Sequence, residues 1–391
     1  MVETQIIDIL RSKVEGYSDV ESVVGPWSDQ IDPRTRAQVH RDLLGTVYGQ
    51  GHPALSQPIE TLIGAQKAGE MLTWLMYVNG KPVGMANIEV MLEAGLAELC
   101  RTVKLPEGTY LPDGTILNGR VNNTVVMYQR LLDFLGSPIA NQIWALQADL
   151  RLAKTIILPD GSTLEAGGAT QHINEVAGLK PWLLCVPRFQ VHPPKGNPHQ
   201  EAFLQSRLYL QPEHIDTSTP LYSPQQNISG SISLSEIARA TYERAFAIQP
   251  YIINSDKQNE KVTPKLTSEA TAGIHFSTIF AEGNVNSGQL IEEVQSALKQ
   301  SRFVEIVIPN HPGNIQTQES CYEVGLIPLG VFPGGRFRVN GGVRIIPTTF
   351  HFGTARYDIR RQIVDIELAR DYRGSRIEEL TYRLHQQWKS I

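Results

Sequence analysis

Residues 167–184, GGATQHINEVAGLKPWLL, return in altered form as residues 313–330, GNIQTQESCYEVGLIPLG. Aligning the two stretches at Thr170 and Thr317 places identical residues at four further positions: Gln171 on Gln318, Gly178 on Gly325, Leu179 on Leu326 and Pro181 on Pro328. Each stretch has the pattern of a helix that ends near its glycine and is followed by an apolar strand. The repetition predicts two related structural units in one chain.

The length of the chain agrees with two units, because 391 residues exceed what one hydrophobic core usually fills. Residues 211–231 are rich in Pro, Ser, Thr and Gln, which is typical of a connection between domains. We therefore expect an N-terminal domain over residues 1–212, a linker over 213–231 and a C-terminal domain over 232–391.

Composition argues against several classes of protein. A net charge of -5 without a run of Lys and Arg argues against nucleic acid and anionic membranes as partners. The N-terminus lacks the pattern of a signal peptide, and no apolar run reaches the roughly 20 residues of a membrane span. Three scattered cysteines form neither a disulfide framework nor a metal motif, and His192 and His199 lack a third ligand. These observations predict a cytoplasmic protein without a metal; the oligomeric state stays open.

Short-range patterns predict the order of elements in the N-terminal half. Helices are expected at 4–14 and 33–46, the second capped by Asp32, and Asn79-Gly80 between strand-like runs indicates a β-hairpin. A strand at 95–105, a helix at 122–136 and a strand at 142–152 follow. Two Pro-Asp-Gly segments, at 111–119 and 158–167, are expected to be inserted hairpin tips.

The C-terminal half returns to the same order. A helix is expected over 233–249, a polar loop over 253–270, a strand over 273–283, a helix over 287–300 and a buried strand over 302–309. The last predicted helix, 375–388, begins with the capping-box pair Ser375 and Glu378. Its apolar stripe, which we expect to pack on the core, consists of Ile377, Leu380, Leu384 and Trp388.

Strand, helix, strand, helix and Gly-Leu-x-Pro, in this order, resembles the GNAT-type acyl-CoA acyltransferase superfamily. The downstream copy has Asn314 eleven residues before Gly325, Thr317 at the small position of the family motif and Leu326 where the family has Phe. The upstream copy shares the small residues and the Gly-Leu pair. The hairpin carries a family-like glycine at position 84, and Val103 and Pro106 resemble the end of the family's fourth strand. The resemblance implies an α+β fold, a mixed sheet layered between helices, with two GNAT-like units in tandem.

The resemblance also implies an acyl-CoA donor, whose pyrophosphate binds at the start of the helix after the fourth strand. The family pattern there is Gln/Arg-x-x-Gly-x-Gly/Ala, and this sequence departs from it at Ile116 and Val121. A phosphate could still be held by residues around this degenerate loop: Val103, Asn118, Gly119, Arg120, Asn122 and Asn123. The alternative is a solvated turn in which Asn123 caps the helix.

Catalysis of amide formation requires a base, and strand carboxylates are the candidates. Glu98, expected on the fourth family strand, or Glu89, expected on the third, are the candidates, because partial burial of a strand carboxylate would raise its pKa. A solvent-facing glutamate, or one paired with Arg101, is the alternative. The family's acidic tyrosine is replaced by Asn174 and Cys321, which leaves His172 as a neighbouring candidate acid.

The sequence therefore predicts an acyltransferase that moves an acyl group from a thioester, either acyl-CoA or a carrier-protein thioester, to a small-molecule amine. One alternative is a non-catalytic binding or structural protein built on degenerate GNAT-like units. Another is decarboxylation of a thioester on the same scaffold, for which a lost tyrosine would be tolerable.

Overall fold

The computed structural model describes residues 2–15, 22–48, 55, 57–105, 108–110, 114, 116–117, 123–154, 156–157, 163–164, 168–191, 198–224, 232–254, 263–271, 276–339 and 341–390. The fold is α+β, with mixed sheet and packed helices, which confirms the predicted class. The chain divides into two compact units. Unit 1 comprises Met1–Asp149, Ile173–Leu179 and Leu208–Gln211, and unit 2 comprises Leu150–His172, Lys180–Arg207 and Pro212–Ile391. The linker over 213–231 stays a prediction.

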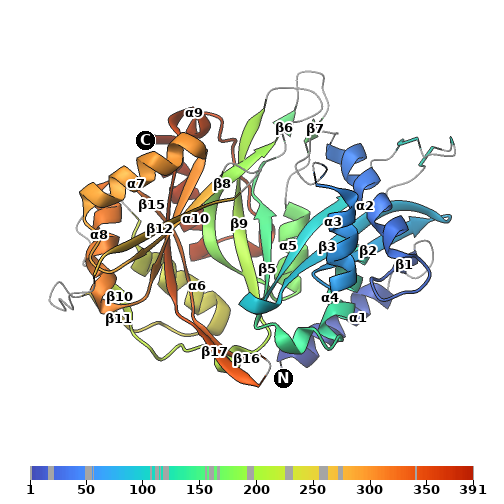
Figure 1. Ribbon diagram of the computed structural model, residues 1–391, viewed down its shortest axis with the longest axis horizontal. Helices are drawn as coiled ribbons and strands as arrows, with labels where there is room; N and C mark the ends of the chain where they lie inside the picture. The colour runs from blue at the N-terminus through green and yellow to red at the C-terminus, as the bar shows by residue number, and fades with distance from the viewer. Residues whose placement is uncertain are drawn as a thin grey trace. The chain divides into compact units, whose positions relative to one another are not determined.

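Unit 1 contains a sheet with the strand order β1-β2-β3-β4-β5 (Figure 1). Neighbouring strands are antiparallel, except that β4 and β5 are parallel. The elements in chain order are α1 Val2–Glu15, β1 Ser22–Val24, α2 Pro33–Tyr48, α3 Ile59–Ala68, β2 Met71–Val78, β3 Lys81–Met91, β4 Leu96–Lys104, α4 Asn123–Leu135 and β5 Ala145–Arg151.

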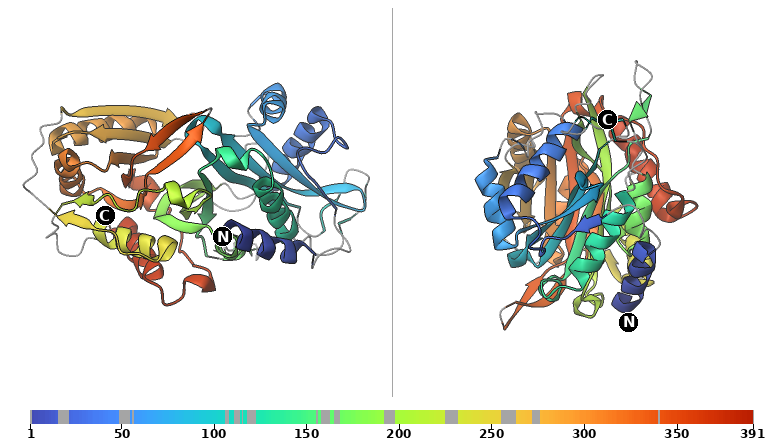
Figure 2. Two further views of the ribbon diagram at one scale, coloured as in Figure 1. Left: turned by 90° about the horizontal axis from the view of Figure 1, so that it is seen from below. Right: turned by 90° about the vertical axis from the view of Figure 1, so that its right-hand side faces the viewer.

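The hairpin that joins β2 to β3 is confirmed. Asn79 and Gly80 both have positive φ, 50° and 73°, as a two-residue type I′ turn requires. The predicted cap of α2 is also present, because the Asp32 carboxylate accepts the backbone N–H groups of Arg34 and Thr35. Figure 2 shows α2 and α3 on one face of this sheet and α1 and α4 on the other. Each face of β2–β4 is therefore covered by two helices.

Unit 2 contains strands in the order β9-β8-β15-β18-β14-β13-β12, in which only β13 and β14 form a parallel pair. The remaining elements in chain order are β6 Ile156–Ile157, β7 Thr163–Leu164, α5 Gly168–Val176, β8 Lys180–Val191, β9 His199–Tyr209, β10 Leu221–Ser223, α6 Leu234–Phe246, β11 Ile252–Asn254, β12 Lys265–Thr271, β13 Phe276–Glu282, α7 Ser287–Gln300, β14 Phe303–Pro309, α8 Ile315–Glu323, β15 Ile327–Phe332, β16 Gly335–Val339, β17 Gly342–Ile346, β18 Thr349–Ala355, α9 Tyr357–Arg360 and α10 Arg376–Ser390. Short antiparallel pairs flank both Pro-Asp-Gly segments, as predicted, and the tips lie outside the described residues.

The predicted polar loop over 253–270 is wrong in part. Residues from Lys265 onward form β12, which pairs with β13 along its whole length. This strand ends the strand order of unit 2 and its side chains are mostly exposed. An edge strand of this kind does not need the alternation of apolar residues that identifies a half-buried strand.

The repeated sequence has a repeated structure. In the first copy the N–H groups of Ala177, Gly178 and Leu179 donate to the carbonyls of residues 173, 175 and 174. In the second copy Val324, Gly325 and Leu326 donate to residues 320, 322 and 321, so every bond recurs 147 residues later. Gly178 and Gly325 both have positive φ, 89° and 76°, which explains why both positions are glycine. Each copy is a helix that ends in the same turn before a strand.

The C-terminal helix α10 packs on the core of unit 2 as predicted. All four residues of its apolar stripe are buried, and the Trp388 indole N–H donates to the Cys185 carbonyl at 2.8 Å. The Glu378 N–H donates to Ser375 Oγ, and the Glu378 carboxylate accepts from Gly374 N–H. The Ser375 hydroxyl therefore caps the Glu378 N–H in the first turn of the helix, and the Glu378 side chain reaches back to Gly374, which precedes the helix.

Candidate active site

The parallel strands of unit 1 separate before β4 ends. Their ladder pairs Leu96 with Ala145 and continues to Leu99 with Ala148. β4 then runs on to Lys104, and over these described residues no further pair joins it to β5. Backbone N–H and C=O groups that leave a ladder in this way are available to a bound molecule.

The two predicted carboxylates lie next to the point where β4 and β5 begin to separate. Glu89 on β3 lies directly opposite Glu98 on β4, one residue before the ladder ends. Glu98 is half-buried and Glu89 is exposed. Cys100 shares the face of Glu98, because alternate residues of a strand point the same way. The Cys100 side chain packs against a cluster from α2, α3 and β2, so the carboxylates lie on the face that these helices cover.

A β-bulge deforms β4 immediately after the paired segment. Met85 pairs with Val103 and Asn87 with Cys100, so two residues of β4 oppose one residue of β3. Arg101, in the bulge, has φ of 46°, a left-handed conformation that is uncommon for arginine. The Asn87 side chain fixes the bulge by donating to the Arg101 carbonyl at 2.9 Å and accepting from Thr73 Oγ1 at 2.7 Å.

Arg130 of α4 supports the bulge from the opposite face. Its Nη1 donates to the Asn87 carbonyl at 2.8 Å and to Thr102 Oγ1 at 3.3 Å, and 1% of the residue is exposed. In the described part of the chain, no carboxylate lies within ion-pair distance of Arg130, and its Nε has no hydrogen-bond partner. Burial lowers the pKa of Arg130 to about 10, which leaves it charged at neutral pH. A buried positive charge thus lies beneath the bulge, and none of the described carboxylates forms an ion pair with it.

Sequence reasoning missed Arg130 and the bulge. One signal was present, since Arg130 stands between Val126 and Phe134 at intervals of four residues, and both are fully buried. A charged residue within a buried helical row indicates a specific polar partner. The bulge had no comparable signal, because it depends on pairing with a second strand.

The predicted phosphate site lies largely outside the described residues. This applies to Asn118, Gly119, Arg120 and Asn122. Asn123 is the first residue of α4, and its side chain is not among those described. Val103 lies on the part of β4 beyond the ladder, and its side chain is buried.

The third predicted catalytic residue, His172, belongs to unit 2 and not to unit 1, which contains the carboxylates. Its Nδ1 lies 3.0 Å from an oxygen of Asp371, and half of its side chain is exposed. The Cys321 and Cys185 thiols are fully buried, and burial raises the pKa of both. These thiols are therefore neutral at physiological pH, which agrees with structural rather than nucleophilic cysteines.

In unit 2 a side chain joins the ends of the parallel strands β13 and β14. Asn314 Oδ1 accepts from Gly283 N–H at 2.6 Å, just after β13, and Nδ2 donates to the Pro309 carbonyl at 2.7 Å, at the end of β14. Thr317 Oγ1 accepts from Val285 N–H in the loop before α7 and also bonds to the Gly283 carbonyl. The backbone groups that follow β13 are thus occupied by α8.

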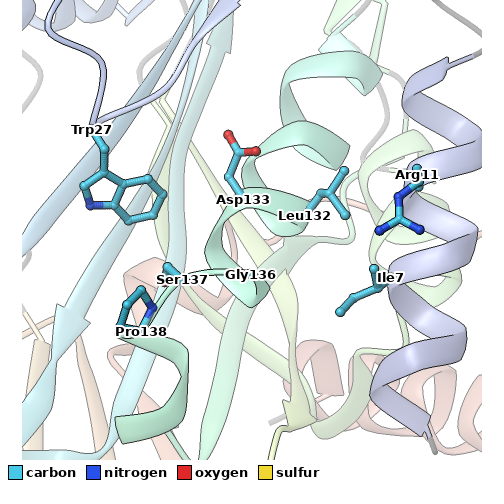
Figure 3. A pocket seen from close by; sticks show the side chains of 8 residues that line it. All are labelled: Ile7, Arg11, Trp27, Leu132, Asp133, Gly136, Ser137 and Pro138. Atoms are coloured by element: carbon cyan, nitrogen blue, oxygen red, sulfur yellow. The ribbon is translucent and has the colours of Figure 1, made fainter.

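A surface hollow of unit 1 lies on the other side of the sheet (Figure 3). Its volume is about 640 Å³, and α1, the segment after β1 and the end of α4 line it. Asp133 in this hollow accepts from the Trp74 indole at 2.8 Å and from Gln129 at 2.6 Å. Trp74 and its neighbour Thr73 point to opposite faces of β2. The hollow therefore lies away from Glu89 and Glu98.

Over the described ranges, the helices include none that is long and apolar enough to cross a membrane. The His, Cys, Asp and Glu residues there form no group of three that could hold a metal ion.

No protein-family model and no curated protein matches the sequence. Among solved structures, the chain is similar to an N-acetyltransferase from Staphylococcus aureus, at 8% identity and a TM-score of 0.31, over 49% of this chain and 99% of that chain. It is also similar to the aminoglycoside 6'-N-acetyltransferase from Enterococcus faecium, at 13% identity and a TM-score of 0.30, over 48% of this chain and 97% of that chain. A third similar structure is the spermidine N-acetyltransferase from Vibrio cholerae in complex with CoA and spermine, at 10% identity and a TM-score of 0.30, over 49% of this chain and 96% of that chain.

Proposed function

We propose that unit 1 transfers an acyl group from a thioester to an amine at the point where β4 and β5 separate. One observation carries the proposal: the parallel ladder ends at Leu99 and Ala148, next to two opposed carboxylates. A thioester carbonyl between separated strands can accept hydrogen bonds from backbone N–H groups, which stabilise the charge of a tetrahedral intermediate.

The proposed chemistry assigns a role to each group at this point. The amine nitrogen forms a bond to the carbonyl carbon, Glu98 accepts the amine proton, and the carbon–sulfur bond breaks to release a thiolate. Glu89, directly opposite on β3, is the alternative acceptor of this proton. Arg130, buried under the bulge, favours the negative charge that develops on oxygen and then on sulfur.

The proposed donor is an acyl-CoA or a carrier-protein thioester, and the proposed acceptor is a small-molecule amine. The N-terminus of α4 follows the degenerate loop over 118–122, and the positive end of a helix dipole favours a phosphate at this point. The three cysteines are free thiols, which supports a cytoplasmic location.

We further propose two GNAT-like units in tandem, of which unit 1 carries the acyl-transfer site between its parallel strands. The shared hydrogen-bond pattern of the two copies supports the common origin of the units. The Asn314 bonds across the ends of β13 and β14 argue against a thioester site between these two strands of unit 2. At the aligned position of the first copy the sequence has Gly167, which has no side chain to form such bonds.

Release of CoA thiol tests the proposal directly. Purified protein is mixed with acetyl-CoA or a long-chain acyl-CoA and with a polyamine, an amino sugar or a peptide amine. We expect amine-dependent thiol release that falls by about 10² to 10⁴ in Glu98→Gln, the usual contribution of a general base. Glu93→Gln, which alters an exposed carboxylate near β4, is the matched control and should retain full activity.

Thermal unfolding with the same ligands separates binding from chemistry. A ligand at about 100 times its dissociation constant stabilises the protein by about 2.7 kcal/mol. A shift without turnover would favour the alternative of a binding protein. The absence of both, with acyl-CoA and with an acylated carrier protein, would overturn the proposal.

A further inference from the structure

A second set of polar side chains lies on one face of the unit 2 sheet. In the register of β14 and β18, Val307 pairs with His351 and Pro309 with Thr349. Glu305 is two residues from Val307, and Thr349 is two residues from His351, so all three polar side chains point to the same face. The register alone therefore brings Glu305, His351 and Thr349 together.

These side chains form a continuous chain of hydrogen bonds. His351 Nδ1 lies 2.7 Å from Glu305 Oε1, and His351 Nε2 lies 2.8 Å from Thr349 Oγ1. Glu305 is 6% exposed and His351 is 7% exposed, whereas Thr349, the first residue of β18, is only half-buried. The hydroxyl at the solvent end of the chain is the group that a substrate could reach.

The protonation pattern follows from the charges around Glu305. Burial acts to raise the pKa of Glu305, but the hydrogen bond and charge of His351 and the charges of Arg188 and Arg207 outweigh burial and lower it. Arg188 Nη1 lies 3.8 Å from Glu305 Oε2. An ionised carboxylate can only accept, so His351 Nδ1 donates to Glu305, and in the neutral imidazole with this tautomer Nε2 can accept the Thr349 hydroxyl proton.

Aromatic contacts hold the imidazole in this orientation. The Phe332 ring packs edge-on against His351, with ring centroids 4.8 Å apart. The guanidinium of Arg207 lies 3.5 Å from the centroid of the same Phe332 ring, on which it stacks. A base that is oriented by a carboxylate and bonded to a hydroxyl is the arrangement that activates an oxygen nucleophile.

We propose that Thr349, His351 and Glu305 form a second catalytic centre, in which Thr349 Oγ1 is acylated by activated esters or thioesters. The hydroxyl oxygen forms a bond to the acyl carbon while its proton passes to His351 Nε2. The bond from the acyl carbon to the leaving oxygen or sulfur breaks, and the leaving group takes the proton from His351. Water then attacks the acyl carbon of the Thr349 ester and gives a proton to His351. The bond between the acyl carbon and Thr349 Oγ1 breaks, and Oγ1 takes this proton back from His351, which releases the carboxylic acid and restores the hydroxyl.

The test uses the full-length protein and p-nitrophenyl acetate as the probe. We expect release of p-nitrophenolate and, after a rapid quench, one added acetyl group that peptide mass spectrometry locates on Thr349. Acylation on Thr349 should disappear in Thr349→Val and persist in Thr349→Ser. The rate of acylation should fall by about 10² to 10⁴ in His351→Gln, which lacks the base. Thr267→Val, which alters an exposed threonine of β12, should behave as the unchanged protein.

Several outcomes would overturn this proposal independently of the proposed function of unit 1. These are the absence of acetylation in the unchanged protein, acetylation on lysines alone, and equal rates in Thr349→Val and the unchanged protein. The mapping on the unchanged protein does not depend on whether any variant folds. Glu98→Gln should leave Thr349 acylation intact, so a failure in one unit is distinguishable from a failure in the other.

Discussion

Truncation of Asn314 should destabilise unit 2 more than its size suggests. The side chain is 2% exposed and satisfies two backbone groups, the N–H of Gly283 and the carbonyl of Pro309. Asn314→Ala leaves both groups without this partner. A buried group that loses its partner costs about 1 to 3 kcal/mol, so the expected loss in the free energy of unfolding is about 2 to 6 kcal/mol.

Asn310→Ala is the matched control for this prediction. Asn310 also joins two backbone groups, accepting from Tyr222 N–H and donating to the Pro220 carbonyl, both at 2.9 Å. Because Asn310 is half-buried, water can replace these bonds, and the expected loss is about 1 kcal/mol or less. Urea unfolding followed by tryptophan fluorescence measures both variants, since Trp182 and Trp388 are buried in unit 2.

A third variant tests the direction of the hydrogen bonds. Asn314→Asp keeps the acceptor for Gly283 N–H but places a carboxylate oxygen against the Pro309 carbonyl. Protonation restores the donor, so the deficit of N314D relative to the unchanged protein should be largest at neutral pH and shrink as the carboxyl group is protonated. The reasoning is refuted if Asn314→Ala is no less stable than Asn310→Ala.

Three further predictions concern other parts of the chain. Leu384→Ala removes a fully buried residue of α10 and should cost about 2 to 5 kcal/mol in a urea titration, whereas Arg383→Ala on the exposed side should cost about 1 kcal/mol or less. Iodoacetamide at pH 8 should leave Cys185 and Cys321 of the native protein unmodified and label them after denaturation, because both thiols are fully buried and burial raises their pKa. Hydrogen bonds from Thr219 and Ser218 lower the pKa of Asp216 to about 2, so its contribution to stability is complete above the ordinary value of 3.8 and is lost as the pH falls through 2. The stability difference between the unchanged protein and Asp216→Asn should therefore shrink over this interval in thermal scans, and a constant difference would contradict the assignment.

Local patterns in the sequence predicted the elements that local physics determines. Asn79-Gly80 fixed a hairpin because both residues tolerate positive φ, and the stripe ending at Trp388 fixed a buried helix. The edge strand β12 was missed because its polar side chains face solvent. Its position is set by pairing with β13, which a local pattern does not encode.

For the candidate sites, too, local sequence patterns predicted the elements, whereas contacts between distant residues could not be predicted. The hairpin signal placed Glu89 on a strand and the apolar pattern of residues 95–105 placed Glu98 on the next one, and the register of those strands then set them opposite each other. The bulge at Arg101 and the buried cation of α4 depend on contacts between elements far apart in sequence. The hydrogen-bond chain from Glu305 to Thr349 likewise follows from the register of two strands that are not consecutive.

The two copies of the helix–turn–strand segment share their main-chain hydrogen bonds and differ in the side chains around them. The backbone bonds that recur 147 residues apart involve only main-chain groups and the two glycines, so they constrain few side chains. The residue that joins the parallel strands, Asn314, lies outside those bonds and is free to differ. Its counterpart is Gly167, and β4 and β5 of unit 1 separate where β13 and β14 of unit 2 are joined by a side chain. Under the proposed function, loss or gain of this single amide decides whether a copy can admit a thioester between its strands.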